Sequence, residues 1–372
     1  MKIGKVLSIC LAISLFLAVL ILFSALFFSN GEKNSDGNLI KILSDNDPQF
    51  QLASEENNIG FPQAHWPHKS YKHEWWYLTA NLCNESGQRF ATQWTLFRTA
   101  IDDKHWYFAH AALADEQQHF AEFREGREEL GTVEVIDTPF SAVINDWTWL
   151  SSADLFPAQL NYGSPQYLLQ SENVVDANLP KTHWRANLSL SANKGFYLQG
   201  DNGFSVKHLS ENIASHYYSQ PFIEVNGEIY WQGSWNKVFG RAWFDREWGS
   251  AMLAEDQQGW DWFSLRLNEQ QALMVYRIRS QKQDFIYGNL MNSDGSSQVI
   301  SSSDIVVTSA QIPNSTYPES FTLTVEKMAI KLNVKIINDQ QVMRFGIEYF
   351  EGMVVFTGTH SGEGFVEMTG YQ

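Results

Sequence analysis

Carboxylates set among tryptophans are the residues of this sequence best suited to chemistry. Residues 243–248 read Trp-Phe-Asp-Arg-Glu-Trp, and the segment Trp260-Asp261-Trp262 follows closely. A buried aspartate beside aromatic rings has a raised pKa and can donate a proton, and tryptophan faces stabilise a developing cation. Asp245 is therefore a candidate general acid. The structural alternative is that Arg246 pairs with its neighbouring carboxylates and locks two domains together.

A second cluster reads His-Glu-Trp-Trp-Tyr at residues 73–77. In a β-strand, Glu74 and Trp76 face one way while Trp75 and Tyr77 face the other. A carboxylate beside bulky rings would be desolvated, so Glu74 is a second candidate acid. Alternatively, Glu74 is bonded to an arginine or to a backbone edge at the mouth of a barrel.

A third cluster is His216-Tyr217-Tyr218. Alternation places His216 and Tyr218 on one face, where an imidazole and a phenol could share a proton path. The alternative is that they pack, with one hydroxyl in water. His110, which shares a face with Trp106 and Phe108, is expected to be a core histidine that contacts a ligand.

Common catalytic motifs are missing from the sequence. There is no Gly-x-Ser-x-Gly nucleophile elbow and no glycine-rich phosphate loop after a strand. Tyr77 stands where a zincin motif starting at His73 would need its second histidine, and Pro67 disrupts a helix that could bring His65 and His68 together. We therefore expect no metal and no cofactor, which leaves chemistry by Asp, Glu, His and Tyr.

Composition excludes some partners. The chain of 372 residues has 26 Lys+Arg against 42 Asp+Glu, a formal net charge of −16. Such a surface repels nucleic acid and disfavours electrostatic attachment to anionic lipids. Aromatic residues make up 14%, which suits a barrel or sandwich with a wide interior. The two cysteines, Cys10 and Cys83, are not expected to pair, because Cys10 lies in the apolar N-terminal segment.

The N-terminus predicts export. Residues 6–28 are 23 consecutive uncharged residues behind Lys2 and Lys5, long enough to span a bilayer with the N-terminus in the cytoplasm. We favour an uncleaved anchor over a cleaved signal peptide, because no small-x-small cleavage site closes the run. In both cases the body is exported, to the periplasmic face of the inner membrane if anchored. Residues 29–60 are expected to be a linker.

The rest of the chain is predicted to be all-β. From about residue 71 the pattern approaches period two, with turn clusters between short runs and no long amphipathic helix. Residues 74–82 align without gaps with 259–267, which suggests an internal duplication. We expect two β-barrel domains at 61–230 and 231–372. Strands are predicted at 71–82, 89–98, 105–114, 119–124, 183–190, 195–198, 227–235, 259–267, 271–279, 284–291, 321–326, 330–337, 342–350, 353–359 and 364–369.

Several motifs, in this order, resemble one family. They are Glu74–Tyr77, Tyr107–Ala112, His216–Ser219, Trp243–Trp248, Trp260–Phe263 and Gly364–Tyr371. The set resembles the lipocalin-like AttH family, whose members carry the label "predicted secreted hydrolase" and are related to carotenoid 1,2-hydratase. The resemblance implies tandem lipocalin-like barrels with a cavity for an apolar ligand, and in some relatives a link to ABC-transporter permeases.

The hydratase relatives have a His-x-Trp motif followed by a Tyr-x-Asp motif whose Asp protonates an alkene. By resemblance, His216 and Asp245 match the His and the Asp. Tyr218 replaces the Trp and Trp243 replaces the Tyr, so the acid is kept while the substrate is in doubt. An export anchor also fits poorly with hydration of a pigment made inside the cell.

Three hypotheses follow. The first is an exported binding protein for an apolar small molecule or lipid, which could serve an ABC transporter. The second is a cofactor-free hydratase, isomerase or cyclase, and the third is a permease partner in which the barrels are only a scaffold. Candidate catalytic residues are Asp245, His216, Tyr218, Trp243 and Glu74; candidate ligand-binding residues are Trp75, Tyr77, His110, Tyr217, Arg246, Glu247, Trp248, Trp260 and Trp262.

Overall fold

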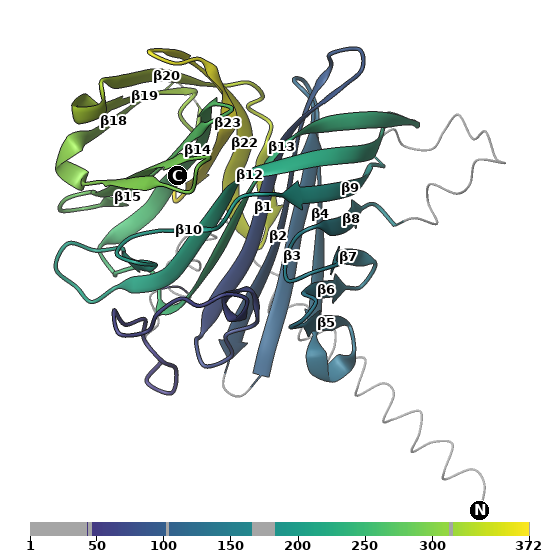
Figure 1. Ribbon diagram of the computed structural model, residues 1–372, viewed down its shortest axis with the longest axis horizontal. Coiled ribbons are helices and arrows are strands. Elements are labelled where there is room, and N and C mark those ends of the chain that lie inside the picture. The colour runs from purple at the N-terminus through teal and green to yellow at the C-terminus, as the bar shows by residue number, and fades with distance from the viewer. Residues whose placement is uncertain (1–42, 44–46, 102–103, 166–182, 312–314, 372) are drawn as a thin grey trace, which may run out of the picture.

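A computed structural model of the chain describes residues 43, 47–101, 104–165, 183–311 and 315–371. It forms two antiparallel, barrel-like sheets that lie side by side (Figure 1). The predicted anchor at 6–28 lies outside the described residues. Within the described part of the chain, no helix is long and apolar enough to cross a membrane.

The first sheet contains strands β1 to β13. Their order is β4-β3-β2-β1-β13-β12-β9-β8-β7-β6-β5, and β10 and β11 pair with β12. The bounds are β1 (His73–Asn84), β2 (Arg89–Ile101), β3 (Lys104–Ala114), β4 (His119–Arg127), β5 (Val133–Ile136), β6 (Ser141–Ile144), β7 (Trp147–Ser151), β8 (Ala158–Gly163), β9 (Arg185–Ala192), β10 (Tyr197–Leu198), β11 (Phe204–Val206), β12 (Ala214–Trp231) and β13 (Ser234–Ala251).

The second sheet contains β14 to β23, in the order β17-β16-β15-β14-β23-β22-β20-β19-β18, with β21 on β22. The bounds are β14 (Gln257–Asn268), β15 (Gln271–Ser280), β16 (Phe285–Asn292), β17 (Ser297–Ile300), β18 (Ile305–Ala310), β19 (Ser320–Val325), β20 (Ile330–Ile336), β21 (Val342–Phe345), β22 (Ile347–Gly358) and β23 (Gly362–Thr369). Four short 3₁₀ turns complete the described elements: η1 (Gln63–His65), η2 (Glu128–Leu130), η3 (Ser302–Asp304) and η4 (Glu326–Met328).

The predicted all-β fold with tandem lipocalin-like barrels is confirmed, and both sheets are nearly closed. In each sheet the first strand of the aligned repeat, β1 or β14, lies between its hairpin partner and a late strand, β13 or β23. The two aligned segments therefore occupy equivalent positions.

The division between the sheets differs from the expected boundary at residues 230 and 231. Those residues lie at the end of β12, which forms a long hairpin with β13 through a turn at Gln232 and Gly233. Both strands belong to the first sheet, so that sheet ends at Ala251. The strand expected over 227–235 is for the same reason the tip of this hairpin and not a single strand.

Among the described residues, the buried apolar side chains form three large hydrophobic clusters and a small fourth one around Met343. One fills the first barrel and includes Trp76, Trp94 and Trp149, and another fills the second barrel around Phe263. The third lies between the sheets and is formed largely by aromatic side chains, among them Trp262. Because side chains alternate along a strand, β1, β12 and β13 supply one face to the first core and the other face to the third.

Candidate functional site

Strand alternation divides the predicted site residues into two groups. Asp245 pairs with Ser219 and Tyr77 across the strands, while Arg246 pairs with Tyr218 and lies one residue further along, on the other face. The odd-numbered side chains of β13 therefore face the second sheet, and the even-numbered ones face the interior of the first barrel.

Asp245 lies between the two sheets, in a pocket of donors. Tyr217 Oη donates to its Oδ2 at 2.7 Å, and Ser219 Oγ and Trp243 Nε1 donate to its Oδ1 at 2.5 and 2.7 Å. Burial raises the pKa of Asp245 to about 7, although these three hydrogen bonds oppose the shift. Asp245 can therefore both hold and release a proton near neutral pH, which is what a general acid requires.

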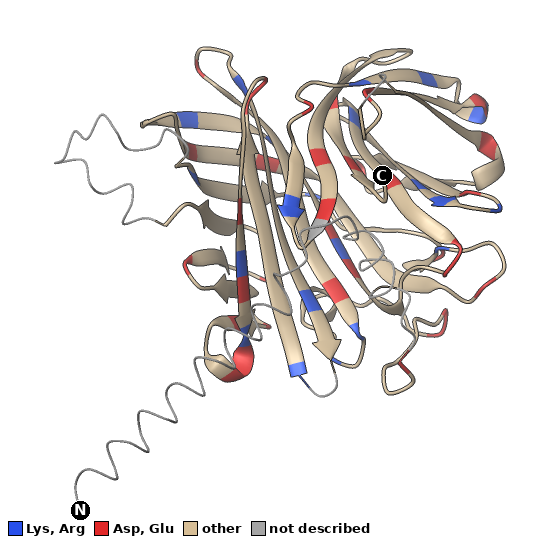
Figure 2. Cartoon of the chain, turned by 180° about the vertical axis from the view of Figure 1, so that it is seen from behind, with Lys and Arg blue, Asp and Glu red and all other residues tan. Residues whose placement is uncertain are grey.

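Two glutamates of the second sheet face this region. Glu367 on β23 and Glu351 on β22 are direct cross-strand partners, and both carboxyl groups are buried. Burial raises the pKa of Glu367 to about 7, and the charge of Asp245 adds to the shift. Burial and the charge of Glu367 hold the pKa of Glu351 well above its usual range. In Figure 2, acidic residues lie on strands of both sheets where the sheets meet.

Glu247, on the same face as Asp245, is held by a lysine. Lys207 Nζ lies 2.8 Å from Glu247 Oε1, and Ser215 Oγ donates to the same oxygen. The ammonium group also lies over the rings of Tyr217 and Tyr276, at 4.9 and 4.5 Å from their centroids. This buried pair accounts for the Glu of the Asp-Arg-Glu motif without involving Arg246.

Aromatic side chains fill the space around the carboxylates. Trp262 contacts Tyr77 and Trp243 edge to face, with centroids 5.3 and 6.0 Å apart, and its Nε1 donates to Tyr217 Oη at 3.2 Å. Trp260 Nε1 donates to Glu367 Oε1 at 3.0 Å. Of the aromatic residues predicted to bind a ligand, Tyr77, Tyr217, Trp260 and Trp262 are therefore brought together here, from both sheets, whereas Trp248 lies in the core of the first barrel.

Glu74 has a different role from the one predicted. It lies inside the first barrel, fully buried, and receives hydrogen bonds from Arg98 Nε, Arg246 Nη2 and the backbone amide of His68. Burial alone would raise its pKa, but the two guanidinium groups hold it well below the usual range. Glu74 is thus a permanent anion and not a proton donor, which is the arginine-bonded alternative.

Arg246 does not lock the two domains together. Its guanidinium lies inside the first barrel, paired with Glu74 and 3.8 Å from the ring centroid of Trp76. Trp248 lies on the same face, where the ring of His68 stacks on it at 3.9 Å. The lock hypothesis is therefore wrong.

His216 and Asp245 do not form a pair, because they lie on opposite faces of the sheet. His216 faces the barrel interior next to Tyr71 and Trp248, and neither ring nitrogen has a hydrogen-bond partner among the described residues. Burial lowers its pKa to about 4. The expected proton path from His216 to Tyr218 is also replaced, since Tyr218 Oη contacts His65 Nδ1 at 2.6 Å.

His110 lies at a separate contact between the sheets. Its Nδ1 is 2.9 Å from the hydroxyl oxygen of Tyr349, and burial lowers its pKa to about 3. A neutral imidazole bonded to one phenol matches the expected core histidine.

Sequence reasoning missed residues that approach from other segments. Glu351, Tyr349 and Lys207 have no neighbouring motif that would single them out, and Ser219 ends the His216–Ser219 motif without having been a candidate itself. Glu367 lies within the closing Gly364–Tyr371 motif, and its position opposite Trp262 could have been found only with the strand register.

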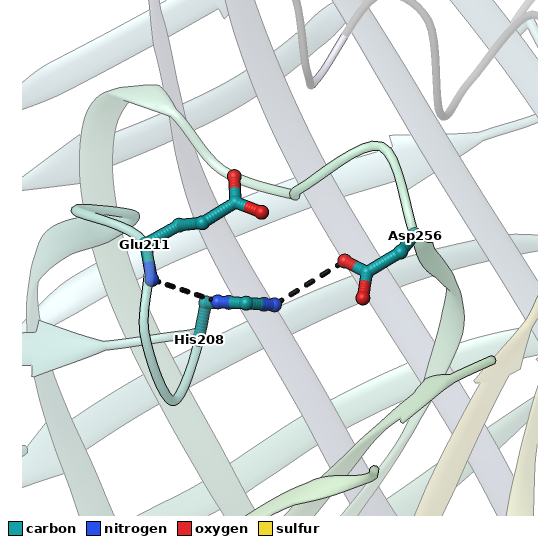
Figure 3. A group of neighbouring side chains, drawn as sticks. All are labelled: His208, Glu211 and Asp256. Atoms are coloured by element: carbon teal, nitrogen blue, oxygen red, sulfur yellow. Dashed lines mark hydrogen bonds and ion pairs between the residues drawn. The ribbon is translucent and has the colours of Figure 1, made fainter. Parts of the chain in front are cut away.

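One further cluster, His208, Glu211 and Asp256, has the residue types of a metal site (Figure 3). His208 Nδ1 accepts hydrogen bonds from the backbone amides of Ser210 and Glu211, at 3.2 and 2.9 Å. The ring proton is therefore on Nε2, 3.2 Å from Asp256 Oδ1. A nitrogen that carries a proton cannot ligate a metal. This arrangement therefore fits a structural role, in which His208 connects the loop at residues 210–211 to Asp256, and not a metal centre.

The chain belongs to the AttH-like family, which it matches over residues 52–371. It is similar to the crystal structure of a Nitrosomonas europaea protein assigned as an AttH, with 26% identity, a TM-score of 0.76 and coverage of 87% of this chain and 99% of that one. No protein of curated function matches it in sequence.

Two more distant structures share the fold. Kievitone hydratase from Nectria haematococca has 12% identity and a TM-score of 0.64, and covers 88% of this chain and 97% of its own. CghA in complex with Sch210972 has 12% identity and a TM-score of 0.53, with coverage of 89% and 98%.

Proposed function

We propose that this AttH-like protein binds an apolar small molecule between its two sheets. The observation that carries the proposal is the facing arrangement of aromatic side chains around Asp245 and Glu367, which combines an apolar wall with a few polar groups. The interior of the first barrel is a poorer candidate, because its polar centre is an ion pair of Glu74 with two arginines.

Ligand binding requires the two faces to open. Tyr77 and Trp262 are in contact, and Trp262 is hydrogen-bonded to Tyr217. An apolar ligand that enters between these rings would replace the contacts that the rings now make with one another. The rings would stay out of water, and the ligand would leave water for an apolar environment.

Native mass spectrometry of the full chain, purified from its host, tests the proposal together with solvent extraction of bound material. We expect a near-stoichiometric apolar ligand that is lost in Trp262→Leu and retained in His216→Ala. Trp262 lies between the sheets and His216 inside the first barrel, so loss in His216→Ala alone would place the ligand inside that barrel. A clean apo mass would favour the permease-partner hypothesis.

The second candidate function is a cofactor-free hydratase, isomerase or cyclase, and the pKa of about 7 at Asp245 favours it. In a hydration, neutral Asp245 gives its proton to one alkene carbon, and Trp243 and Trp262 face the cation that develops on the other. Water then adds to that carbon and returns a proton to the Asp245 carboxylate. The two distant structural relatives, kievitone hydratase and CghA, share the fold of this chain, and their likeness shows the fold alone.

Deuterium labelling tests catalysis on whichever ligand the protein retains. Reversible protonation in D₂O would place deuterium on a carbon of the bound ligand, where it survives extraction into H₂O. We expect labelling in the native protein and none in Asp245→Asn, with the ligand retained in both. A retained but unlabelled ligand in the native protein would leave binding as the function.

Export, a periplasmic position at the inner membrane and an ABC-transporter permease as partner remain proposals supported by the sequence. The uncharged run at 6–28 supports the anchor, and family resemblance supports the permease. Retention of the chain in membranes after alkaline washing, with its body accessible to protease only from the periplasm, is the expected result.

A further inference from the structure

We propose that the ligand between the sheets is an apolar molecule that carries one carboxylate group, and that Arg266 binds this carboxylate beside the tryptophans of the site. This inference rests on the proposed binding function and specifies the chemical class of its ligand.

Arg266 lies on the face of β14 that packs against the first sheet. Phe263 and Leu265, on the other face, belong to the core of the second barrel, whereas Trp262 packs between the sheets. Arg266 follows Trp262 on the same face, about 13 Å further along the strand. Its Nη2 reaches across to the first sheet and donates to the backbone oxygen of Ala242 at 3.4 Å. The positive charge therefore lies at the same contact between the sheets as the proposed ligand site.

Arg266 forms no ion pair within the part of the chain that the structure describes. Its hydrogen bond to Ala242 is long for a charged donor. Of the two glutamates that influence it, Glu269 already accepts a hydrogen bond from Arg241 Nη2 at 3.1 Å. Glu363 acts on Arg266 through its charge and is not bonded to it. Most of the N–H groups of this guanidinium are thus left for another acceptor.

A comparison with Arg277 shows what a bound carboxylate does to such a group. Burial lowers the pKa of an arginine, but in Arg277 the ion pair with Asp261 outweighs burial and the pKa is raised. In Arg266, burial and the charge of Arg241 prevail and lower the pKa to about 10. A partly buried charge without a partner destabilises the folded protein, so an anion that binds Arg266 would be stabilising.

A carboxylate is the anion that suits this position. The two parallel N–H groups of a guanidinium fit the two oxygens of a carboxylate, and a single negative charge matches the single unpaired positive charge. A doubly charged phosphate would be repelled more strongly by Glu269 and Glu363. A pure hydrocarbon would leave Arg266 unpaired. The ligand that fits both features places its apolar part against Trp262 and its carboxylate at Arg266.

A fluorescent fatty acid and its ester test this assignment. Cis-parinaric acid and its methyl ester have the same apolar chain, but only the acid is charged near pH 7. Binding of each to the full chain is measured by fluorescence titration, below the concentration at which either forms micelles. We expect the native protein to bind the acid about tenfold more tightly than the ester, because a charge-assisted hydrogen bond is made to the acid alone.

Two substitutions of Arg266 separate its charge from its bulk. In Arg266→Met the acid should lose this advantage and bind as the ester does, while the affinity for the ester stays within about threefold of the native value. Arg266→Lys should keep a smaller preference for the acid, since an ammonium group binds a carboxylate as a point charge without the paired geometry. Glu363→Gln should strengthen binding of the acid and leave the ester unchanged, because it removes a competing negative charge.

Arg344→Met is the matched control, since it removes a charge of the same sign from an exposed ion pair on β21. Both probes should bind it as they bind the native protein, and Trp262→Leu should weaken both. Equal affinity of the native protein for acid and ester, or a preference for the acid that persists in Arg266→Met, would overturn the inference and leave apolar binding intact. Failure of both probes to bind would instead overturn the proposed function, and the inference with it.

Discussion

Replacing Asp245 by asparagine should change how the free energy of unfolding depends on pH. Burial raises the pKa of this carboxyl to about 7, compared with about 3.8 for an exposed aspartate. The folded state therefore holds the proton more tightly than the unfolded state. The stability that this contributes is present at low pH and is lost as the pH rises towards and through 7. Asparagine, which does not titrate, removes this contribution.

The magnitude follows from proton linkage. At pH 6 the folded Asp245 is about nine-tenths protonated, and at pH 8 about one-tenth, while the unfolded chain is ionised at both. Integrating over this interval gives a loss of about 1.4 kcal/mol from pH 6 to pH 8 that the variant lacks. Glu367 and the buried histidines also titrate differently on unfolding. The histidine contributions are present in both proteins, so the comparison isolates Asp245 together with the part of the Glu367 shift that its charge causes.

Urea unfolding followed by tryptophan fluorescence at pH 6, 7 and 8 measures the effect. We expect the unfolding free energy of the native protein to fall by about 1.4 kcal/mol more than that of Asp245→Asn across this range. Asp137→Asn, at an exposed position, is the control and should follow the native curve. If native and Asp245→Asn proteins show parallel pH dependence, Asp245 does not hold a proton near neutrality, and its role as an acid is refuted.

Two further predictions concern the first barrel and the contact between the sheets. Glu74→Gln removes the anion shared by two buried arginines and should lower the free energy of unfolding by about 3–5 kcal/mol in the same urea assay. Glu348→Gln, which removes the acid of an exposed ion pair, is the control and should lower it by less than about 1 kcal/mol. His110→Gln should reduce acid unfolding: the pKa of this buried histidine is about 3, so its stabilising contribution is complete above pH 6.5 and falls by about 1.4 kcal/mol per pH unit below it. An unchanged acid midpoint in His110→Gln would contradict this reasoning.

The fold was predictable because apolar and polar residues alternate along many of its strands. Residues 330–336 alternate buried and exposed without exception, and the predicted strand at 330–337 is confirmed almost to the residue. The four short strands from Val133 to Gly163 were not predicted, because strands of four to six residues between turns give too few alternations. The β12–β13 hairpin was misjudged for another reason: its 18-residue strands are buried almost throughout at one end, where alternation disappears.

The site was only partly predictable, because motifs record neighbours along the chain and not across sheets. Because side chains alternate along a strand, the sequence alone shows that Asp245 and Arg246 cannot lie on the same face of the sheet. This is enough to place Asp245 and Glu247 on one face and Arg246 on the other. The alternation of side chains does not show which residues of the other sheet pack against each face. Glu367 lies close enough to Asp245 for the charge of Asp245 to raise its pKa only because β23 of the second sheet packs against β1 of the first, and nothing in either segment encodes that packing.

The position of the acids ties any activity to the contact between the two sheets. Asp245 and Glu367 belong to different sheets, yet the charge of Asp245 raises the pKa of Glu367 while the sheets are together, and burial raises the pKa of both. If the sheets separate, both carboxyl groups gain water, their pKa values fall, and both release protons near neutral pH. Opening the interface for a ligand is therefore coupled to proton release, and closing over an apolar ligand is coupled to proton uptake. A proton donor is thus restored at the same moment as the ligand is enclosed, which is the order that protonation of an enclosed alkene would require.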